Sequence, residues 1–433
     1  MKKYNQNKNV YDAVQERLKT IFDEFDNIFV SFSGGKDSGL LLNLVLDYKR
    51  KTNDPRKIGV FHQDFEAQFT FTTDFVSRMF ENNIKEIEPY WFCVPMAVRT
   101  AVSNHSIYWY PWDDEKKELW IRPMPKYDYI INQYNAPEFY QYKMSQEDVY
   151  SKFGKWYADN RKGKTICLLG LRTDESLTRF RAYANENKQT LDGKNWTTKV
   201  QANLYTAYPL YDWKTQDVWI ANGKFAYDYN KIYDLYYKAG LTIHQMRVAS
   251  PFIEDAKHSL NLYRIIEPAT WAKIVGRVHG ANFAAIYGGT KALGFRNVKL
   301  PKGHTWKSYV KFLLDTLPEE VKENYKRKFA TSIEFWRNRG GVLKQETIEE
   351  LQKIGIPLKV VGKTNYKTEK LAVIFTDYPD DADVKEFQSV PTYKRMAYTI
   401  LKNDHLCKYM GFSQTKEEVE RRKRVIEKYK SIL

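Results

Sequence analysis

Short apolar runs alternate with amphipathic helical stretches over the first half of the chain, and this alternation limits the fold more than any other feature. Residues 10–25 carry apolar side chains at helical spacing, and helices are also expected from Asp37 to Lys51 and over 67–82. The apolar runs read as strands, at 27–32, 57–64, 87–94, 165–171 and 203–210. Strands that alternate with helices predict an α/β fold with a mostly parallel, doubly wound sheet covered on both faces.

The pattern changes along the chain and predicts several parts. An N-terminal helix (1–25) precedes a sheet domain (26–245), which is interrupted by an aromatic-rich insertion at 97–160. Beyond about residue 245 the pattern becomes mainly helical, with a connecting segment (246–310) and a basic C-terminal domain (311–433) around one β-like stretch at 371–375. The aromatic side chains of the insertion either cap a ligand site, stacking on bases, or pack against one another in a small helical excursion.

Charge and composition narrow the classes of protein. No apolar run reaches the ~18–20 residues of a membrane span, and the N-terminus lacks the apolar core of a signal peptide, so a cytoplasmic protein is expected. The formal net charge is +16, and half of it falls on residues 301–433, which end in the basic run 421–430. That run is either a nucleic-acid or acidic-partner site or a solvated helix face, since Glu417, Glu418 and Glu420 precede it.

The segment Ser33-Gly34-Gly35-Lys36-Asp37-Ser38 joins the first apolar run to the next helix. Glycines permit a tight turn there, and the amides of the turn and of the helix start form a positively polarised nest for an anion. The serines add hydroxyl donors, Lys36 adds a full charge, and Asp37 is a candidate Mg²⁺ ligand through water. The spacing differs from the Walker A pattern and from G-x-G-x-x-G.

This segment resembles the PP-loop, S-G-G-x-D-S, of the N-type ATP pyrophosphatases and phosphoadenosine phosphosulfate (PAPS) reductases. The stretch 170–179, G-L-R-T-D-E-S-L-T-R, is similar to G-x-R-x-x-E-S-x-x-R of PAPS reductases, and 208–219 is similar to P-L-x-D-W-x-x-x-D-V-W. The run 227–240 continues the resemblance, which covers roughly residues 25–245. It implies the HUP-like adenine nucleotide alpha-hydrolase fold, with 26–245 as a nucleotide-binding domain.

The resemblance also implies site residues. Arginine forks match phosphate or sulfate oxygens, although Arg172 and Arg179 could instead be surface arginines paired with Asp174 and Glu175. His62 and Asp64 stand where the family meets the adenosine, but a core histidine and a capping aspartate fit equally. Asp212 is expected to cap the helix that follows it, with Trp213, Val218 and Trp219 docking that helix on the sheet. The expected catalytic residues are Lys36, Asp37, Arg172 and Arg179, and the expected ligand contacts are Ser31, Ser33, Gly34, Gly35, Lys36, Asp37, Ser38, His62, Asp64, Gly170, Arg172, Ser176 and Arg179.

The three cysteines depart from the reductase pattern. Reductases use a nucleophilic thiol near the C-terminus, and some bind an iron–sulfur cluster through paired cysteines. Here Cys93 and Cys167 fall in apolar runs and are expected in the core, so no iron–sulfur cluster is expected. Cys407 is either structural or activated, because His405 and two lysines beside it would lower its pKa.

The region 245–433 is similar to the extra C-terminal module of a PAPS reductase-like subgroup that is often encoded beside a ParB/sulfiredoxin-like protein. The resemblance implies that protein as a partner, and Arg247, His244 and Lys291 as groups that reach the nucleotide. The leading hypothesis is an adenine-nucleotide enzyme that cleaves ATP between the α and β phosphates, with Mg²⁺, to adenylate an acceptor. The alternatives are a PAPS or adenosine phosphosulfate reductase using Cys407 or an external thiol, and a nucleotide-gated module that binds DNA or protein with little catalysis.

Overall fold

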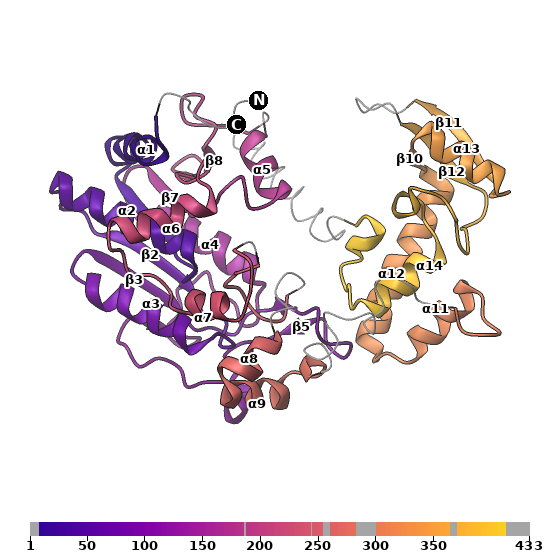
Figure 1. Cartoon of the computed structure of the whole chain (residues 1–433), viewed down its shortest axis with the longest axis horizontal. Coiled ribbons are helices and arrows are strands. Elements are labelled where there is room, and N and C mark those ends of the chain that lie inside the picture. The colour runs from indigo at the N-terminus through magenta and orange to yellow at the C-terminus, as the bar shows by residue number, and fades with distance from the viewer. Residues whose placement is uncertain are drawn as a thin grey trace. The chain divides into compact units, whose positions relative to one another are not determined.

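The computed structural model describes residues 8–185, 188–243, 245–253, 260–282, 300–363 and 370–412. The chain divides into two compact units. The first unit comprises Met1–Val98 and Tyr108–Arg277, and the second comprises Arg99–Ile107 and Val278–Leu433. In Figure 1 the first unit carries the indigo to red elements, and the second carries the orange and yellow ones.

The first unit is built on a seven-stranded sheet with the order β6-β3-β2-β1-β7-β9-β8. Neighbouring strands run parallel except β8, which is antiparallel to β9. This confirms the predicted α/β class with a mostly parallel sheet. The strands are β1 (Asn27–Ser31), β2 (Ile58–Gln63), β3 (Ile87–Phe92), β6 (Ile130–Ile131), β7 (Thr165–Leu169), β8 (Thr197–Gln201) and β9 (Leu204–Ala207).

Five of these strands are the predicted apolar runs, and two were not predicted from the sequence. β6 is only two residues long. β8 is the edge strand T-T-K-V-Q, mostly polar and exposed, so it has no apolar run to detect.

Helices cover both faces of the sheet because successive strand residues point to opposite sides. Ile28 and Val30 of β1 join one large core with side chains from α1, α2, α3 and α6. Phe29 points the other way and packs edge-to-face on Phe153 of α4, at 5.5 Å between ring centroids. The doubly wound arrangement is therefore confirmed, with these helices: α1 (Val10–Glu24), α2 (Lys36–Thr52), α3 (Thr70–Asn83), α4 (Gln146–Asp159), α5 (Leu177–Ala184) and α6 (Thr215–Lys224).

The aromatic-rich insertion, predicted at 97–160, contains only short elements before α4. Helix α4 lies within that range, but it packs on the sheet as one of the covering helices. Three later helices complete the first unit: α7 (Ile232–Lys238), α8 (Leu260–Ile266) and α9 (Pro268–Arg277). The short elements are β4 (Val98–Arg99), β5 (Tyr108–Trp109) and the 3₁₀ helix η1 (Asp114–Leu119).

The second unit is mainly helical around a three-stranded antiparallel sheet of order β10-β12-β11. The predicted stretch 371–375 is β12, and its two partners were not predicted because β10 has three residues and β11 is largely exposed. The helices are α11 (Trp306–Asp315), α12 (Glu319–Glu334), α13 (Gln345–Lys353) and α14 (Tyr393–Leu401), and the remaining elements are β10 (Gly341–Leu343), β11 (Leu358–Lys363), β12 (Leu371–Phe375), η4 (Phe335–Arg339), η5 (Phe387–Ser389) and η6 (Lys408–Met410).

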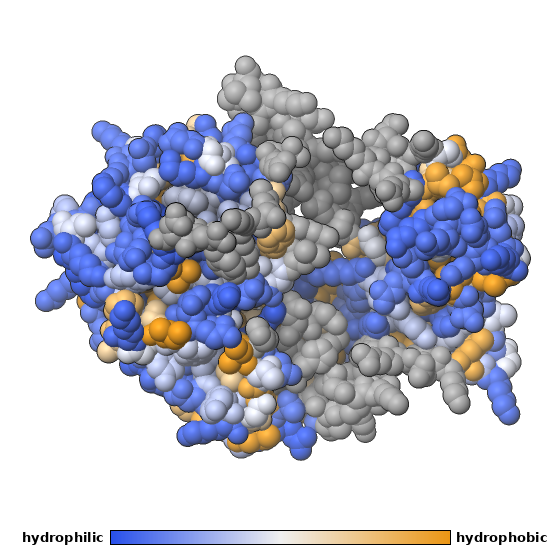
Figure 2. All heavy atoms as spheres, turned by 45° about the horizontal axis from the view of Figure 1, so that its top comes forward, coloured by the Kyte–Doolittle hydropathy of each residue, from blue (hydrophilic) through white to orange (hydrophobic). Residues whose placement is uncertain are grey.

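The described residues on the face seen in Figure 2 are largely hydrophilic. Figure 2 shows hydrophilic residues over most of the visible face, with hydrophobic side chains in small separate groups, as in ordinary globular proteins. Among the described segments, none of the helices combines the length and the apolar character needed to cross a membrane.

Candidate functional site

The glycine turn lies at the carboxyl end of β1, in the middle of the sheet. Gly34 has φ +74°, a left-handed conformation that side chains rarely adopt, and Gly35 is the N-cap of α2 without a side-chain hydrogen bond. Ser33 Oγ and Ser38 Oγ lie 2.9 Å apart, and Ser38 Oγ accepts from Ser33 N at 3.2 Å. The two hydroxyls therefore brace the turn, and the first amides of α2 open towards the edge of the sheet where ligands bind in such folds.

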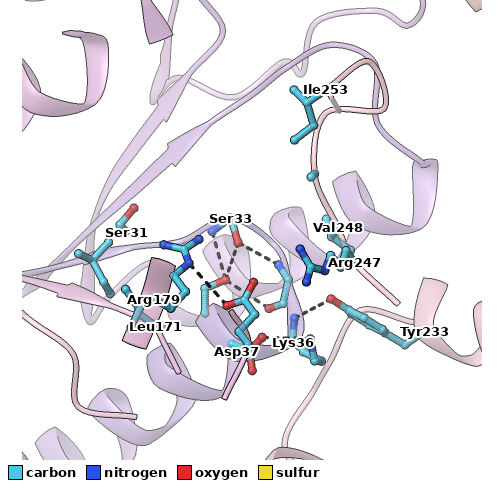
Figure 3. A pocket seen from close by; sticks show the side chains of 16 residues that line it. Ser31, Ser33, Lys36, Asp37, Leu171, Arg179, Tyr233, Arg247, Val248 and Ile253 are labelled. Atoms are coloured by element: carbon cyan, nitrogen blue, oxygen red, sulfur yellow. Dashed lines mark hydrogen bonds and ion pairs between the residues drawn. The ribbon is translucent and has the colours of Figure 1, made fainter. Parts of the chain in front are cut away.

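The turn is also held by side chains that lie almost 200 residues downstream. Asn230, which is fully buried, donates from Nδ2 to Gly34 O at 3.0 Å and to Thr72 Oγ1 at 2.9 Å. The Tyr233 hydroxyl accepts from Lys36 N at 3.0 Å, as the dashed line in Figure 3 marks. Burial raises the pKa of Tyr233, so its hydroxyl keeps the proton and can donate it to a ligand. The Lys36 amide is therefore bound by the Tyr233 hydroxyl, which can donate to a ligand in its place.

A charged triad lies directly behind the turn. The Asp37 carboxylate accepts from Arg172 Nε at 2.6 Å and lies 3.1 Å from Lys36 Nζ. All three side chains are mostly buried, with 3% of Arg172, 8% of Lys36 and 16% of Asp37 exposed. Two cations share one carboxylate, so the triad carries a net charge of +1. Arg172 Nη1 is buried without a hydrogen-bond partner, which leaves a donor and a charge for an anion to satisfy.

A cavity of about 340 Å³ opens in front of the turn. Arg179 and Arg247 lie on opposite sides of it in the view of Figure 3. Arg179 pairs loosely with Glu175 at 3.8 Å and is half exposed, so its guanidinium is accessible. Glu175 also lines the cavity, and its charge is offset by Arg179. The remaining lining residues are Ser31, Ser33, Gly35, Lys36, Asp37, Ser38, Leu169, Gly170, Leu171, Tyr233, Val248, Ala249 and Ile253.

Gly170 allows β7 to end against α2. A Cβ atom at this position would lie 2.8 Å from Asp37 C and from Ser38 N, both of which are backbone atoms. The role expected from the sequence was close approach of a ligand, whereas the contact that requires glycine here is with the chain itself. Arg247, expected to reach the site from the later region, does line the cavity, while His244 and Lys291 lie outside the described residues.

Five of the expected contact residues do not line the cavity: Gly34, His62, Asp64, Arg172 and Ser176. Gly34 lies in the turn itself, and Arg172 lines a smaller pocket together with Lys36 and Arg247. Ser176 is the N-cap of α5 and accepts from Arg179 N at 3.3 Å. His62 is fully buried, with Nδ1 2.8 Å from Phe32 O, and burial lowers its pKa. Asp64 is fully buried and accepts from Trp91 Nε1 at 2.8 Å and from Arg122. These contacts favour the core interpretation of His62 and Asp64 over the nucleotide one.

The capping role predicted for Asp212 is wrong. The N-cap of α6 is Lys214, whose amide donates to Asp217 Oδ2 at 2.7 Å. Asp212 instead forms a buried ion pair with Arg17 of α1, because a cation from the N-terminal helix reaches it. Trp213 and Val218 do join the core, as predicted, whereas Trp219 is only half-buried and packs edge-to-face on Tyr229 and Tyr233.

The cysteines are all buried. Cys93, Cys167 and Cys407 are 0%, 2% and 0% exposed, which confirms the core placement of the first two. For Cys407 the structure favours the structural alternative over the activated one, because burial and then Asp404 raise its pKa while only Lys328 opposes the shift. The residue precedes η6 with φ 56°.

Sequence reasoning assigned no role to Tyr233 or Asn230. Both lie in the run 227–240 that continues the family resemblance, and that resemblance was the one signal pointing to them.

Among solved structures, the chain is partly similar to phosphoadenylyl-sulfate reductase of Candida auris, with 15% identity, coverage of 51% of this chain and 84% of that chain, and a TM-score of 0.26. It is also partly similar to FMN adenylyltransferase of Candida glabrata with FMN and an ATP analogue, with 15% identity, coverage of 49% of this chain and 54% of that chain, and a TM-score of 0.28. The third is the U34-tRNA thiolase NcsA of Methanococcus maripaludis with its [4Fe-4S] cluster, with 13% identity, coverage of 70% of this chain and 87% of that chain, and a TM-score of 0.31. TM-scores below 0.5 do not establish a common fold, so the fold class rests on the strand order and connections described above.

Sequence comparison gives a full-length match. Residues 240–421 match the family model described as "Domain of unknown function (DUF3440)". The Escherichia coli (strain K12) protein named "Uncharacterized protein YbdN" is 31% identical over 418 residues, which cover 95% of this chain and 92% of that protein. The chain therefore belongs to the family of YbdN.

Proposed function

We propose that the chain is an adenine-nucleotide enzyme that cleaves ATP between its α and β phosphates and adenylates an acceptor. The observation that carries the proposal is the triad of Lys36, Asp37 and Arg172, which holds a net positive charge behind a glycine turn. An unbalanced buried charge costs several kcal/mol, so such an arrangement is expected to have an anion as its counterpart. The PP-loop resemblance of residues 33–38 supports a nucleotide as that anion.

Several groups around the cavity would each bind part of a polyphosphate. The amides of the turn and the Tyr233 hydroxyl would donate to phosphate oxygens in the cavity, and the spare Arg172 Nη1 would donate from the smaller pocket that it lines with Lys36 and Arg247. Arg179 and Arg247 would contribute guanidinium groups from two sides of the cavity.

The same residues do not fit a resident metal ion. Among the described residues no group of three or more His, Cys, Asp or Glu side chains is placed to hold one. Asp37, the expected Mg²⁺ ligand, already pairs with the charged groups of Lys36 and Arg172. The proposal therefore places Mg²⁺ with the nucleotide phosphates, which it would help to neutralise, and not with a protein ligand set.

In the proposed reaction a nucleophilic atom of the acceptor attacks the α-phosphorus. A new bond forms to that phosphorus, the bond to the oxygen bridging the α and β phosphates breaks, and pyrophosphate leaves with the electron pair. The proton of the acceptor passes to solvent. Lys36, Arg172 and the flanking arginines stabilise the charge that develops on the leaving oxygen, and loss of one such donor is expected to lower turnover by about 10²–10³-fold.

The geometry gives less support to the thiol-dependent reductase. Cys407 is fully buried and the pKa of its thiol is raised, so it is not poised as a nucleophile. A sulfated nucleotide presents the same anionic oxygens and belongs in the same assay. The nucleic-acid role of the basic run 421–430 and the ParB/sulfiredoxin-like partner remain predictions, and that run lies outside the described residues.

The test uses the full chain with ATP labelled at the α-phosphate, Mg²⁺ and a small-molecule extract as the source of acceptor, with PAPS in a parallel reaction. We expect label in AMP or in an adenylated product, together with pyrophosphate. Lys36→Met and Arg172→Met should each lower the formation of both by about 10²–10³-fold, and Lys19→Met, on the exposed face of α1, should leave it unchanged. Release of ADP and phosphate, PAPS reduction without ATP cleavage, or ATP binding equal in wild type and Arg172→Met would overturn the proposal.

A further inference from the structure

A second, larger cavity of about 840 Å³ lies in the first unit, away from the glycine turn. Its floor includes Cys93, which directly follows β3, and Ile130 of β6. Cys93 follows the carboxyl end of β3, and Ile130 pairs with Trp91 near that same end, so the cavity opens at the same edge of the sheet as the first one. Only β2 separates β3 from β1, which puts the two strand ends about 10 Å apart at the usual strand spacing.

The wall of this cavity is aromatic. Trp112 and Trp120 meet edge-to-face, at 5.1 Å between ring centroids and an interplanar angle of 88°. Trp112 is almost fully buried, whereas Trp120 is only half-buried. Tyr127 and Met124 continue the lining. Aromatic faces in a cavity of this size are typical of sites for flat ring systems.

The aromatic wall is fixed by a buried acidic residue at the end of β2. The Glu66 carboxylate is fully buried and accepts from Trp112 N and from Ile121 N, each at 2.7 Å. Trp112 Nε1 donates to Asp64 O at 3.0 Å, and Arg122 pairs with the Asp64 carboxylate. The segment that carries both tryptophans is therefore attached to the sheet by charged groups, and the wall is formed before any ligand arrives.

Charged side chains line the rim of the cavity. Lys117, Lys126 and Lys273 are balanced by the carboxylates of Asp114, Glu118 and Asp128, so the rim has no net charge. The cation next to the stacking face is Lys117, whose Nζ lies 5.7 Å from the centre of the Trp120 ring. A ring on Trp120 would therefore have a cation next to it.

We infer that this cavity binds a planar aromatic or heterocyclic compound that carries an anionic group. If the proposed function holds, that compound is the acceptor, because its site lies two strands from the nucleotide cavity on the same edge. The ring stacks on Trp120, the anionic group pairs with Lys117, and the wall held by Glu66 keeps the site in place.

The experiment measures binding of indole-3-carboxylate and of uridine monophosphate to the full chain by ligand-detected NMR and calorimetry. Indole and inorganic phosphate serve as the separate halves of the probes. An ATP analogue that cannot be cleaved at the α–β bond fills the first cavity, so that the aromatic anion reports on the second. We expect at least one aromatic anion to bind more tightly than either half.

Trp120→Leu should weaken that binding by roughly tenfold or more, and Lys117→Met by several-fold. The matched controls are the neighbouring residues Leu119→Ala and Lys116→Met, which are exposed and do not line the cavity and should bind as wild type does. Absence of binding at millimolar concentration, or binding unchanged in Trp120→Leu, would overturn the inference. Failure of the ATP analogue to bind would sink the proposed function alone, because the Trp120 comparison can be made without it.

Discussion

Replacement of Gly170 by alanine tests how closely β7 must approach the start of α2. The new Cβ would lie 2.8 Å from Asp37 C and Ser38 N and 2.9 Å from Asp37 O, whereas ordinary contacts begin at 3.4 Å. All three atoms are backbone, so no side chain can rotate away, and the first turn of α2 must withdraw by about 0.6 Å. Overpacking of this kind costs about 1–3 kcal/mol. A shift of that size in the residues that hold phosphate should lower nucleotide turnover by about tenfold or more.

Hydrogen exchange of peptides from α2 measures the local free energy of opening, and pyrophosphate release measures turnover. Gly154→Ala in α4 is the matched control, because its Cβ would meet only side-chain atoms at 3.6 and 3.7 Å. That variant should gain about 0.5–1 kcal/mol from helix propensity. The prediction is contradicted if α2 in the Gly170→Ala variant is as well protected from hydrogen exchange as in wild type and nucleotide turnover is unchanged.

Three further predictions concern buried groups. Arg17→Met leaves Asp212 as an unpaired buried carboxylate and should lower the free energy of unfolding of the first unit in urea by about 3–5 kcal/mol. The double variant Arg17→Met/Asp212→Leu should regain most of that loss, and equal stability of the single and double variants would contradict this prediction. Burial raises the pKa of Glu66 from 4.5 to about 7, so the folded state binds the proton more tightly than the unfolded state does. The free energy of unfolding should therefore fall as pH rises between these two values, and a Glu66→Gln variant should lack this dependence. Parallel pH profiles of stability for wild type and Glu66→Gln would refute the prediction. No thiol of the native chain should react quickly with a disulfide reagent, and Cys407→Ser should leave ATP turnover unchanged, whereas rapid titration of one thiol would revive the reductase hypothesis.

The sequence predicts those parts of the fold whose signal is local. Five strands appear as apolar runs because both faces of a parallel strand are buried, and the glycine turn appears as a motif between one of them and a helix. β8 has no such signal, since an edge strand can stay polar.

The candidate site depends more on distant contacts. The resemblance of residues 170–179 places Arg172 and Arg179 near an anion, but whether a guanidinium faces the cavity or a carboxylate is decided by its neighbours. Arg172 pairs with Asp37, 135 positions earlier, and Asp212 pairs with Arg17, 195 positions earlier. No spacing rule covers such separations, and this is why the helix-capping role assigned to Asp212 was wrong.

The anchoring of the glycine turn by Asn230 and Tyr233 has a consequence for how the protein is made. The ribosome delivers the motif within the first 40 residues, but Gly34 O and Lys36 N obtain their partners only when residues 230 and 233 have emerged. A nascent chain or a truncated product that ends before them should therefore contain the whole motif and still have no affinity for ATP. Ribosome-bound chains stalled on either side of residue 233 would show this step directly.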